Sequence, residues 1–393
     1  MSEPVINLNE LDKSNWKTYR FDEIASSISK RIDPTTTDLD IYIGLEHLDS
    51  GSIHIKRQGK RDDVSGQKLR FYPGDVIFAR RRAYQRKAGI ATTDGFCSAH
   101  SLVLRANTDV IDPQLLPFFL HSDLFMHRAV DISVGSLSPT INWGTLRKQQ
   151  FKIPPRSQQL DHARLLSALD NLLLTRQALV NSLEVSQSVF FEHRMASDRN
   201  NRKVLRDVLI DIFAGKSPKG DPRPANADEH GVLKVSAVGD GVYVESENKC
   251  LVDQTKFDQK YEVKPGFILV TRANANLSGI GRPCVVSNTR NGLMLSDKTL
   301  RLIPKSELIC GRFLFQLLRT KAYRNYVESA AGGTEAKNIS QKLLGEAPIW
   351  VPEAQVQDEV VLKLEAMDMA ISESKRELEA LVTLRASILE KVF

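Results

Sequence analysis

Two stretches of the chain carry the apolar spacing of long helices. In residues 353–393 apolar side chains recur at alternating steps of four and three, and two polar residues, Ser374 and Arg385, fill the remaining positions of a heptad seam. Residues 156–196 repeat this pattern 198 positions earlier, with polar interruptions at the matching Arg176 and Gln187. At 1.5 Å per residue each helix would extend about 55–60 Å.

One helix of this kind is also typical of the packed core of a globular domain. Two helices that share both register and interruptions favour a coiled coil instead. The predicted seam positions are Leu166, Leu169, Leu173, Val180, Leu183 and Phe190 in the first helix and Leu364, Met367, Ile371, Leu378, Leu381 and Ile388 in the second.

The globular stretches that precede the two helices are also related. Phe71–Arg80 and Val263–Arg272 align at an offset of 192, and in each a Pro-Gly turn leads into a short apolar run that ends at an arginine. This pattern predicts a turn followed by a buried strand. Closer to the helices the offset is 198, as expected if a loop between the two anchors differs in length. The pairs that share the offset of 198 are Gly135 and Gly333, Ile141 and Ile339, and Gln159 and Gln357.

The repeat predicts an α+β protein with two similar mixed α/β heads and two long helices. Because a whole head separates the helices in sequence, they can pair as an antiparallel coiled coil about a pseudo-twofold axis, with the heads at the two ends of the pair. The predicted domains are residues 1–155, the first head; 156–196, the central long helix; 197–352, the second head; and 353–393, the C-terminal long helix.

The composition permits nucleic-acid binding without requiring it. The 393 residues carry a formal charge of +6, and the isoelectric point is about 9.0. No run of about 18 apolar residues predicts a membrane span, and the polar, acidic N-terminus does not resemble a secretory signal. The four cysteines lack CxxC spacing, which favours reduced thiols, and we expect a cytoplasmic location.

The basic charge is concentrated in residues 56–87, where eleven basic and three acidic side chains leave a local charge of +8. Lys and Arg at this density drive salt-dependent binding to DNA phosphates. The arginines that begin at Arg80 follow a predicted buried strand and so have a rigid base; the alternative is a solvated loop. The predicted DNA-binding residues here are Arg57, Lys60, Arg61, Arg80, Arg81, Arg82, Tyr84, Gln85, Arg86 and Lys87.

The matching segment of the second head is rich in Asn rather than Arg. Arg can pair with guanine N7 and O6 and Asn with adenine N6 and N7, although an Asn-rich turn has the same composition. Two different loops on similar scaffolds suit an asymmetric target. The predicted DNA-binding residues here are Arg272, Asn274, Asn276, Ser278 and Arg282.

Residues 353–393 hold nine acidic and five basic side chains, a net charge of −4. This helix is therefore a poor DNA surface and a good surface for a protein partner, although any solvated helix has a charged outer face.

Catalytic and metal-binding signatures are not recognisable in the sequence. The chain lacks an Asn/Asp-Pro-Pro-aromatic motif for amino-methyl transfer, and its histidines show no HxxxH or HExxH spacing. Gly279-Ile-Gly281 is an isolated fragment, and Gly215-Lys216-Ser217 lacks the first glycine of a phosphate-binding loop. We therefore predict no catalytic residue and no metal site.

The duplicated order of head and long helix resembles the specificity subunit of type I restriction–modification enzymes over essentially the whole chain. Several phrases carry the resemblance. They are Tyr42-Ile-Gly-Leu-Glu46 with Ser50-Gly51, Phe213-Ala-Gly-Lys-Ser-Pro218, Gly135-Ser-Leu-Ser-Pro-Thr-Ile141, and Phe151-Lys-Ile-Pro-Pro155 through Gln159. The second copy keeps the last phrase more loosely, as Trp350-Val-Pro-Glu353.

The resemblance implies that each head is a target recognition domain for one half of a split, asymmetric duplex DNA site, and that the helices fix the gap between the halves. It also implies two methyltransferase subunits that bind S-adenosylmethionine and further motor-nuclease subunits, with no cofactor on this chain and no membrane contact. Two alternatives stay open from the residues: a single-chain DNA-modifying enzyme with an unrecognised catalytic motif, and a protein-binding scaffold.

Overall fold

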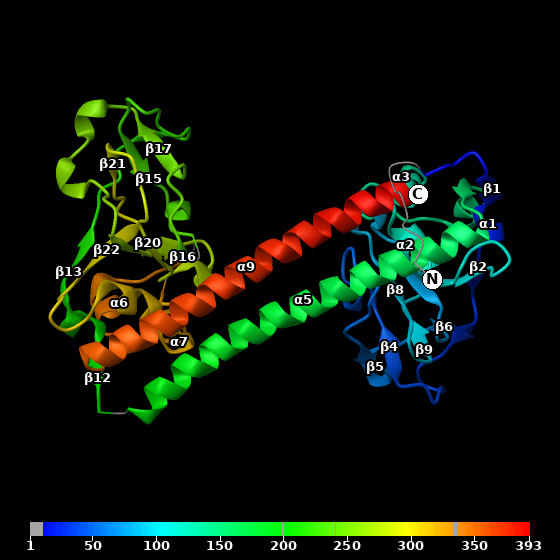
Figure 1. The fold of residues 1–393 in the computed structure, drawn as a ribbon, viewed down its shortest axis with the longest axis horizontal. Helices are drawn as coiled ribbons and strands as arrows, with labels where there is room; N and C mark the ends of the chain where they lie inside the picture. Colours follow the sequence, from blue (N-terminus) through cyan, green and yellow to red (C-terminus); the bar gives the residue numbers. More distant parts are fainter. Residues whose placement is uncertain (1–10, 199, 240, 333–336) are drawn as a thin grey trace, which may run out of the picture. The chain divides into compact units, whose positions relative to one another are not determined.

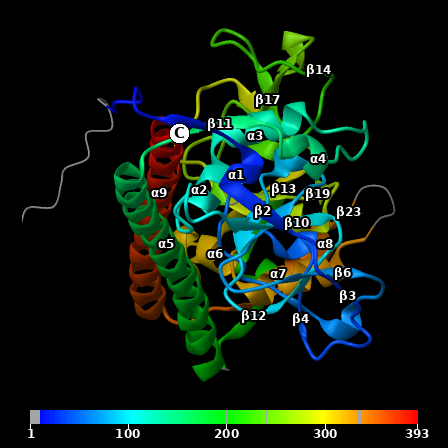
Figure 2. The ribbon, with the colours of Figure 1, turned by 90° about the vertical axis from the view of Figure 1, so that its right-hand side faces the viewer.

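The computed structural model describes residues 11–198, 200–239, 241–332 and 337–393. It divides into two compact units: unit 1 comprises Met1–Ala178 with Lys375–Phe393, and unit 2 comprises Leu179–Ser374. The long helices α5 (Arg156–Ser197) and α9 (Ala354–Val392) each contribute one segment to both units (Figures 1 and 2). The boundary between the units therefore crosses both helices, whereas the sequence suggested separate helical domains.

The described residues of unit 1 form two larger sheets and four short helices beside its helix pair. A four-stranded sheet has the order β2-β10-β7-β8, a five-stranded sheet has the order β3-β6-β9-β4-β5, and β1 pairs with β11. Its 3-10 turns include η1 (Leu45–His47) and η3 (Ala83–Gln85). The elements are β1 (Lys17–Arg20), α1 (Phe21–Ile24), β2 (Ala25–Ile28), β3 (Arg31–Ile32), β4 (Ile41–Ile43), β5 (Gly59–Lys60), β6 (Lys68–Phe71), β7 (Val76–Ala79), β8 (Ala88–Ile90), β9 (Gly95–Cys97), β10 (Ser101–Ala106), α2 (Leu116–His121), α3 (Asp123–Asp131), α4 (Trp143–Leu146) and β11 (Gln150–Ile153).

Unit 2 repeats this plan. Its larger sheets have the orders β13-β22-β18-β20-β16 and β14-β17-β15-β21, while β12 pairs with β24 and β19 with β23. A 3-10 turn, η5 (Val235–Ala237), follows β15. The elements are β12 (Arg202–Val204), β13 (Leu209–Ala214), β14 (Gly220–Asp221), β15 (Gly231–Leu233), β16 (Gly241–Val242), β17 (Asn248–Leu251), β18 (Ile268–Thr271), β19 (Ala273–Asn274), β20 (Pro283–Val285), β21 (Leu293–Met294), β22 (Thr299–Pro304), α6 (Gly311–Leu317), α7 (Lys321–Ala330), β23 (Lys337–Asn338), α8 (Gln341–Gly345) and β24 (Pro348–Trp350).

The predicted buried strands, β7 and β18, are each covered on both faces. Successive side chains of a strand point to opposite faces, and in β7 Val76 and Phe78 join the core beside the helices while Ile77 joins the core beneath the other sheet. In β18, Ile268 and Leu269 divide between two cores in the same way. Continuous apolar runs result because neither face meets water.

The Pro-Gly turns also agree between the units. Gly74 and Gly266 precede β7 and β18 and have φ angles of 87° and 84°. This left-handed conformation is open to glycine at little cost, which accounts for glycine at both positions.

The two helix segments in each unit run antiparallel, which confirms the predicted coiled-coil pairing. In unit 1, Arg176 pairs with Glu377 at 2.9 Å. In unit 2, Arg194 pairs with Glu359 at 3.3 Å. Each unit has a second such pair, Asp170 with Arg385 in unit 1 and Gln187 with Asp368 in unit 2, so within each unit a later position on α5 meets an earlier position on α9. Among the predicted seam residues, the buried ones are Leu166, Leu169, Leu173, Val180, Leu364, Ile371 and Ile388, and the half-buried ones are Leu183, Phe190, Met367, Leu378 and Leu381.

The end of α5 departs from the predicted seam. Phe191 is fully buried, and its ring lies 6.2 Å from that of Phe313 and 6.0 Å from that of Trp350. Phe190, the predicted seam residue, is half-buried. The helix packs there against the head of unit 2 as well as against α9, so heptad spacing alone does not determine which side chain is covered.

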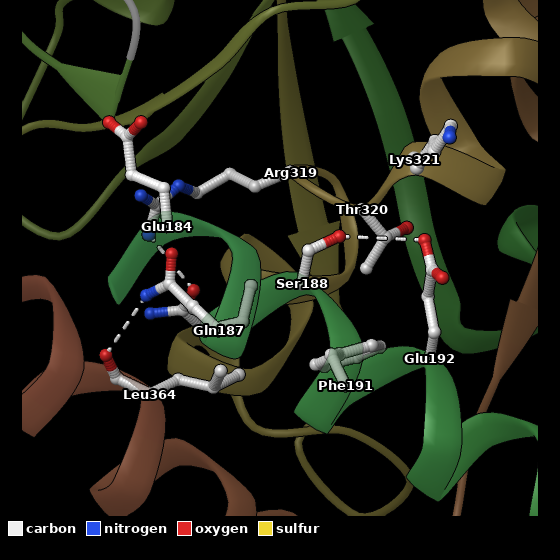
Figure 3. Close-up of a pocket in the computed structure, with 10 residues that line it drawn as sticks. Glu184, Gln187, Ser188, Phe191, Glu192, Arg319, Thr320, Lys321 and Leu364 are labelled. Atoms are coloured by element: carbon white, nitrogen blue, oxygen red, sulfur yellow. Dashed lines mark hydrogen bonds between the residues drawn. The ribbon is translucent and has the colours of Figure 1, made fainter. Parts of the chain in front are cut away.

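Two of the four polar interruptions of the seam, Gln187 and Arg385, bind aspartates that are 198 residues apart. Arg385 Nη1 lies 3.4 Å from Asp170 in unit 1, and Gln187 Nε2 donates to Asp368 at 2.9 Å in unit 2. The same Gln187 Nε2 also donates to the Leu364 carbonyl at 3.3 Å (Figure 3). The head of each unit reaches the same aspartate: His54 contacts Asp170, and Arg319 donates two hydrogen bonds to Asp368, at 2.6 and 2.8 Å. Both aspartates therefore connect two helices and a head.

Each head joins its helix through a glutamine with the same three backbone partners. Gln159 Oε1 accepts from the Asp112 amide at 2.7 Å, and Nε2 donates to the Val110 and Pro154 carbonyls, both at 2.8 Å. Gln357 makes the equivalent set with partners shifted by 198: it accepts from the Cys310 amide at 3.0 Å and donates to the Leu308 and Pro352 carbonyls at 2.8 Å. This agreement explains why both glutamines align in the sequence.

We expect Gln357→Leu to destabilise unit 2 by about 2 kcal/mol or more, because it leaves one amide and two carbonyls without their partner in a buried position. Chemical denaturation followed by tryptophan fluorescence measures the loss. Gln355→Leu, at an exposed position on the same helix, is the matched control and should change stability by less than about 0.5 kcal/mol. Equal effects of the two variants would contradict a structural role for the junction.

His121, at the end of α2, is a buried histidine whose burial lowers its pKa to about 4. Its Nε2 lies 2.8 Å from the Ala88 carbonyl, so this nitrogen carries the hydrogen. The unfolded chain, with a histidine pKa near 6.5, binds the proton more readily between pH 6.5 and 4. The contribution of this group to stability is thus present above pH 6.5 and is lost as the pH falls.

Because of this lowered pKa, we expect the free energy of unfolding to fall by about 2 kcal/mol when the pH is lowered from 7.5 to 5. His121→Gln keeps a donor without the titration, and we expect its stability to fall less over this range than that of the wild type. The exposed His127→Gln is the control. Denaturant unfolding at the two pH values compares the three proteins, and identical pH profiles for His121→Gln and wild type would exclude this linkage.

Candidate nucleic-acid interface

The loop of residues 80–87, between β7 and β8, is fixed to the frame of unit 1 by its backbone. The Arg80 amide donates to the His100 carbonyl at 3.3 Å, and the Arg80 carbonyl accepts from the Ile141 amide at 2.9 Å. Next, the Arg82 amide donates to Pro139 at 2.7 Å. The arginines therefore begin on a rigid base, where β7 meets the Gly135–Ile141 segment.

Two arginines of this loop have left-handed backbone conformations. Arg82 has a φ of 54° and Arg86 a φ of 49°, on either side of η3. Non-glycine residues in this region are uncommon and concentrate at functional sites. The Ser50 hydroxyl donates to the Gln85 carbonyl at 2.6 Å, so Ser50-Gly51 stabilises the turn. Tyr84, at its tip, is 57% exposed.

The loop forms one wall of an open cavity of about 370 Å³. Neither Arg81 nor Arg82 forms an ion pair with a carboxylate in the part of the chain that the structure describes, and both line this cavity. Partial burial, followed by the positive charges of Arg81, Arg80 and Lys68, lowers the pKa of the nearby His100. The lining residues are Leu45, Glu46, Ala79, Arg81, Arg82, Gln85, Lys87 and Ser138.

The other predicted residues of unit 1 do not all face this cavity. Arg57 pairs with Asp49 at 2.6 Å, Arg86 pairs with Asp123, and Arg61 donates to the Thr37 carbonyl at 2.9 Å. Lys60 is exposed on β5. The basic segment thus contains two kinds of side chain: those that bind other groups of unit 1, and those that line the cavity with Arg81 and Arg82.

Unit 2 holds its corresponding loop in the same frame. The Arg272 amide donates to the Lys298 carbonyl at 2.8 Å, and the Arg272 carbonyl accepts from the Ile339 amide at 3.0 Å. Ala273 pairs with Asn338, as Arg81 pairs with Thr140 in unit 1. Gly333, which the sequence aligned with Gly135 of this frame, lies outside the described residues.

The Asn-rich segment of unit 2 forms a turn. Asn274 Oδ1 accepts from the Asn276 amide at 3.1 Å, and Arg282 Nε donates to the Ser278 carbonyl at 2.8 Å. Asn276 and Ser278 are exposed, whereas Arg272, Asn274 and Arg282 are half-buried. The turn and the polar surface predicted from the sequence are therefore both present in one segment.

Sequence reasoning missed the basic aromatic surface that precedes this turn. Lys216 Nζ lies 5.2 Å from the ring centre of Tyr261, whose ring stacks on Phe213 at 5.4 Å. A Cβ on Gly215 would lie 1.9 Å from the Leu295 carbonyl oxygen, so glycine is required there. The Phe213–Pro218 segment contains two of these three side chains, Phe213 and Lys216, but the third, Tyr261, is distant in sequence and could not be placed beside them.

The described residues contain no group of three His, Cys, Asp or Glu side chains that could hold a metal ion. All four cysteines are described and have free thiols. No helix in the described ranges is long and apolar enough to cross a membrane.

The profile of the type I restriction modification DNA specificity domain matches residues 13–185 and 205–383, one copy in each half of the chain. The chain belongs to this family. Because the two matches cover most of the chain, family membership extends to both heads.

Curated relatives include two specificity subunits. The type I restriction enzyme EcoEI specificity subunit of Escherichia coli is 34% identical over 179 residues, 45% of this chain and 30% of that protein. The putative MjaX specificity subunit of Methanocaldococcus jannaschii is 22% identical over 391 residues, 88% of this chain and 84% of that protein. The match to the first relative thus spans about a third of its length.

Solved structures support the fold. The type I restriction-modification system S subunit from M. genitalium has a TM-score of 0.57 at 15% identity, over 96% of both chains. A chain from a structure of type I system assembly and conformational transition has a TM-score of 0.56 at 19% identity, over 96% of this chain and 97% of that one. Together with the repeat, these similarities confirm the α+β fold of two heads and two long helices.

Arg81 and Arg82, which line the cavity, predict how DNA binding depends on salt. We expect the variant Arg81→Ala/Arg82→Ala to bind duplex DNA more weakly at low salt, with the slope of log K against log salt reduced by about 1 to 2, because each lost phosphate contact removes about one counterion. The control Arg164→Ala/Lys152→Ala removes the same charge from exposed positions on α5 and β11. Measuring the affinity for DNA at several salt concentrations tests this. An unchanged slope in the loop variant would show that this loop does not contact DNA.

Proposed function

We propose that this chain is a non-catalytic, sequence-specific DNA-binding subunit that reads a split, asymmetric duplex site and directs the other subunits of a type I restriction–modification enzyme. The observation that carries the proposal is the pair of matched frames around Arg80 and Arg272, which present different polar side chains. Two heads that recognise different half-sites need the same backbone support but different side chains on it.

The chemistry of each loop supports base reading. In unit 1, guanidinium groups of Arg81 and Arg82 and the amide of Gln85 line one cavity, and Arg and Gln are suited to guanine and adenine edges in the major groove. In unit 2, Asn276 and Ser278 are exposed beside the half-buried Arg272. Phosphate contacts from the surrounding basic residues would position the duplex, while these groups select the sequence.

The proposed partners are duplex DNA, two methyltransferase subunits and motor-nuclease subunits. S-adenosylmethionine would bind the methyltransferase subunits, with no cofactor on this chain, and the complex would act in the cytoplasm. Helix α9 is acidic and exposes apolar side chains, and both properties support its use as a docking surface for a partner subunit. Leu362, Met369 and Val382 of α9 are 63%, 74% and 56% exposed.

Methyl transfer to DNA in the assembled complex tests this proposal. Purified chain with labelled S-adenosylmethionine and DNA should transfer no methyl group, and addition of the methyltransferase subunit should produce methylation at one split sequence. Methylation by the chain alone would favour a single-chain enzyme, and an assembled complex without salt-dependent DNA binding would favour a protein scaffold.

Exchange of one head distinguishes the two readers. If residues 197–350 are replaced by the corresponding segment of a related specificity subunit, one half of the methylated sequence should change and the other should stay the same. Sequencing of methylated positions before and after the exchange gives the result, and exchange of residues 1–155 is the reciprocal control. A change in both halves from one exchange would contradict independent reading.

A further inference from the structure

The cavity of unit 1 contains one carboxylate among its basic side chains. Glu46 lines the same cavity as Arg81, Arg82, Gln85 and Lys87. Its side chain is 64% exposed, so the carboxylate is accessible from outside the protein. The basic composition of the segment does not account for this carboxylate.

The backbone around Glu46 is well fixed. Glu46 is the middle residue of η1, which follows β4. The His47 amide donates to the Gly44 carbonyl at 3.1 Å, and His47 Nδ1 accepts from the Gly44 amide at 2.9 Å. The Glu46 carboxylate lies over Gly44, where a Cβ would come within 2.0 Å of Oε1. The carboxylate therefore projects from a rigid turn into space that glycine leaves free.

The carboxylate is not consumed by a strong ion pair within the described chain. Among the described residues, the basic side chain within 4 Å of it is His47, with Nε2 3.9 Å from Oε1. Lys87, which shares the cavity, donates instead to the Leu45 carbonyl at 2.9 Å. Glu46 thus offers free acceptor capacity in a cavity whose other charged groups are donors.

A carboxylate on a DNA-binding surface repels phosphates, so a favourable contact requires a hydrogen-bond donor on a base. The major groove presents two such donors, cytosine N4 and adenine N6. Adenine also presents the acceptor N7 beside N6, which repels a carboxylate, whereas cytosine presents no acceptor of its own there. The arginines in the same cavity suit the guanine that pairs with cytosine.

We propose that Glu46 reads the exocyclic amino group of a cytosine in the half-site bound by unit 1. This inference rests on the proposed DNA-reading function and adds a specificity-determining residue to it. Unit 2 lacks the equivalent group: η5 has Ser236 at the middle position, and its hydroxyl donates to Glu247. A requirement of this kind therefore belongs to one half-site alone.

The variant Glu46→Gln tests the proposal in the assembled complex with its methyltransferase subunit. Glutamine keeps the size of the side chain but replaces one acceptor oxygen with a donor. We expect discrimination against non-cytosine bases to fall at least about fivefold at one position of the half-site read by unit 1, because a specific base contact contributes about 1 kcal/mol or more. The half-site read by unit 2 should not change.

Asp62→Asn is the matched control. Asp62 lies in the same basic segment with its side chain 87% exposed, so the control makes the same change in net charge away from the cavity. Binding to duplexes with each base pair at each position, together with sequencing of methylated positions, compares the variants. Thermal unfolding of Glu46→Gln confirms that it is folded, and Glu46→Asp provides a second variant with the charge retained and the reach shortened.

Several outcomes would overturn the proposal. Unchanged discrimination, or a loss at a position where the wild type requires adenine, would show that Glu46 does not read cytosine. Uniformly tighter binding to all sequences, equal to that of Asp62→Asn, would show that the carboxylate only repels phosphates. A wild-type complex that neither binds nor methylates DNA would instead reject the proposed function itself.

Discussion

A carboxylate held between two helices needs hydrogen-bond donors, and in each unit one such carboxylate connects the helix pair to the head. Asp170 has a side chain that is 6% exposed, and it lies against Arg385 of the opposite helix and His54 of the head. Asp368, 198 residues later, binds Gln187 of the opposite helix and Arg319 of the head. Removing the donors to Asp170 would leave a buried charge uncompensated, which is far more costly than losing an exposed ion pair. Asp368 is half-buried, with a side chain that is 28% exposed. Each head is thereby fixed to its helix pair by electrostatic as well as apolar contacts.

Much of this architecture could be predicted from the sequence because it depends on periodic or repeated local patterns. Heptad spacing gave the two long helices, and matched interruptions such as Arg176 indicated that they form a pair. The partners of the interruptions could not be predicted, since Asp170 and Asp368 occupy positions outside the seam. The burial of Phe191 in place of Phe190 was also beyond heptad spacing, because it depends on Trp350, a residue distant in sequence.

The strands and backbone contacts that support the candidate interface could be predicted from the sequence, but the side chains that it exposes could be predicted only in part. Arg80 and Arg272 end matching strands, and the structure holds both by matching backbone hydrogen bonds. Charge density alone could not separate Arg86, which pairs with Asp123, from Arg81, which lines the cavity. It also concealed Glu46, because a single acid within a basic surface is recognised only when the fold brings η1 beside the loop.

The junctions between heads and helices have a consequence for how this chain can diverge over time. Gln159 and Gln357 bind main-chain amides and carbonyls only. A peptide group is the same whatever side chain it carries, so the fastening does not depend on the identity of the residues that it holds. Mutations can therefore accumulate throughout the attached surface, and whole segments can be inherited from another lineage, while the attachment point remains chemically unchanged.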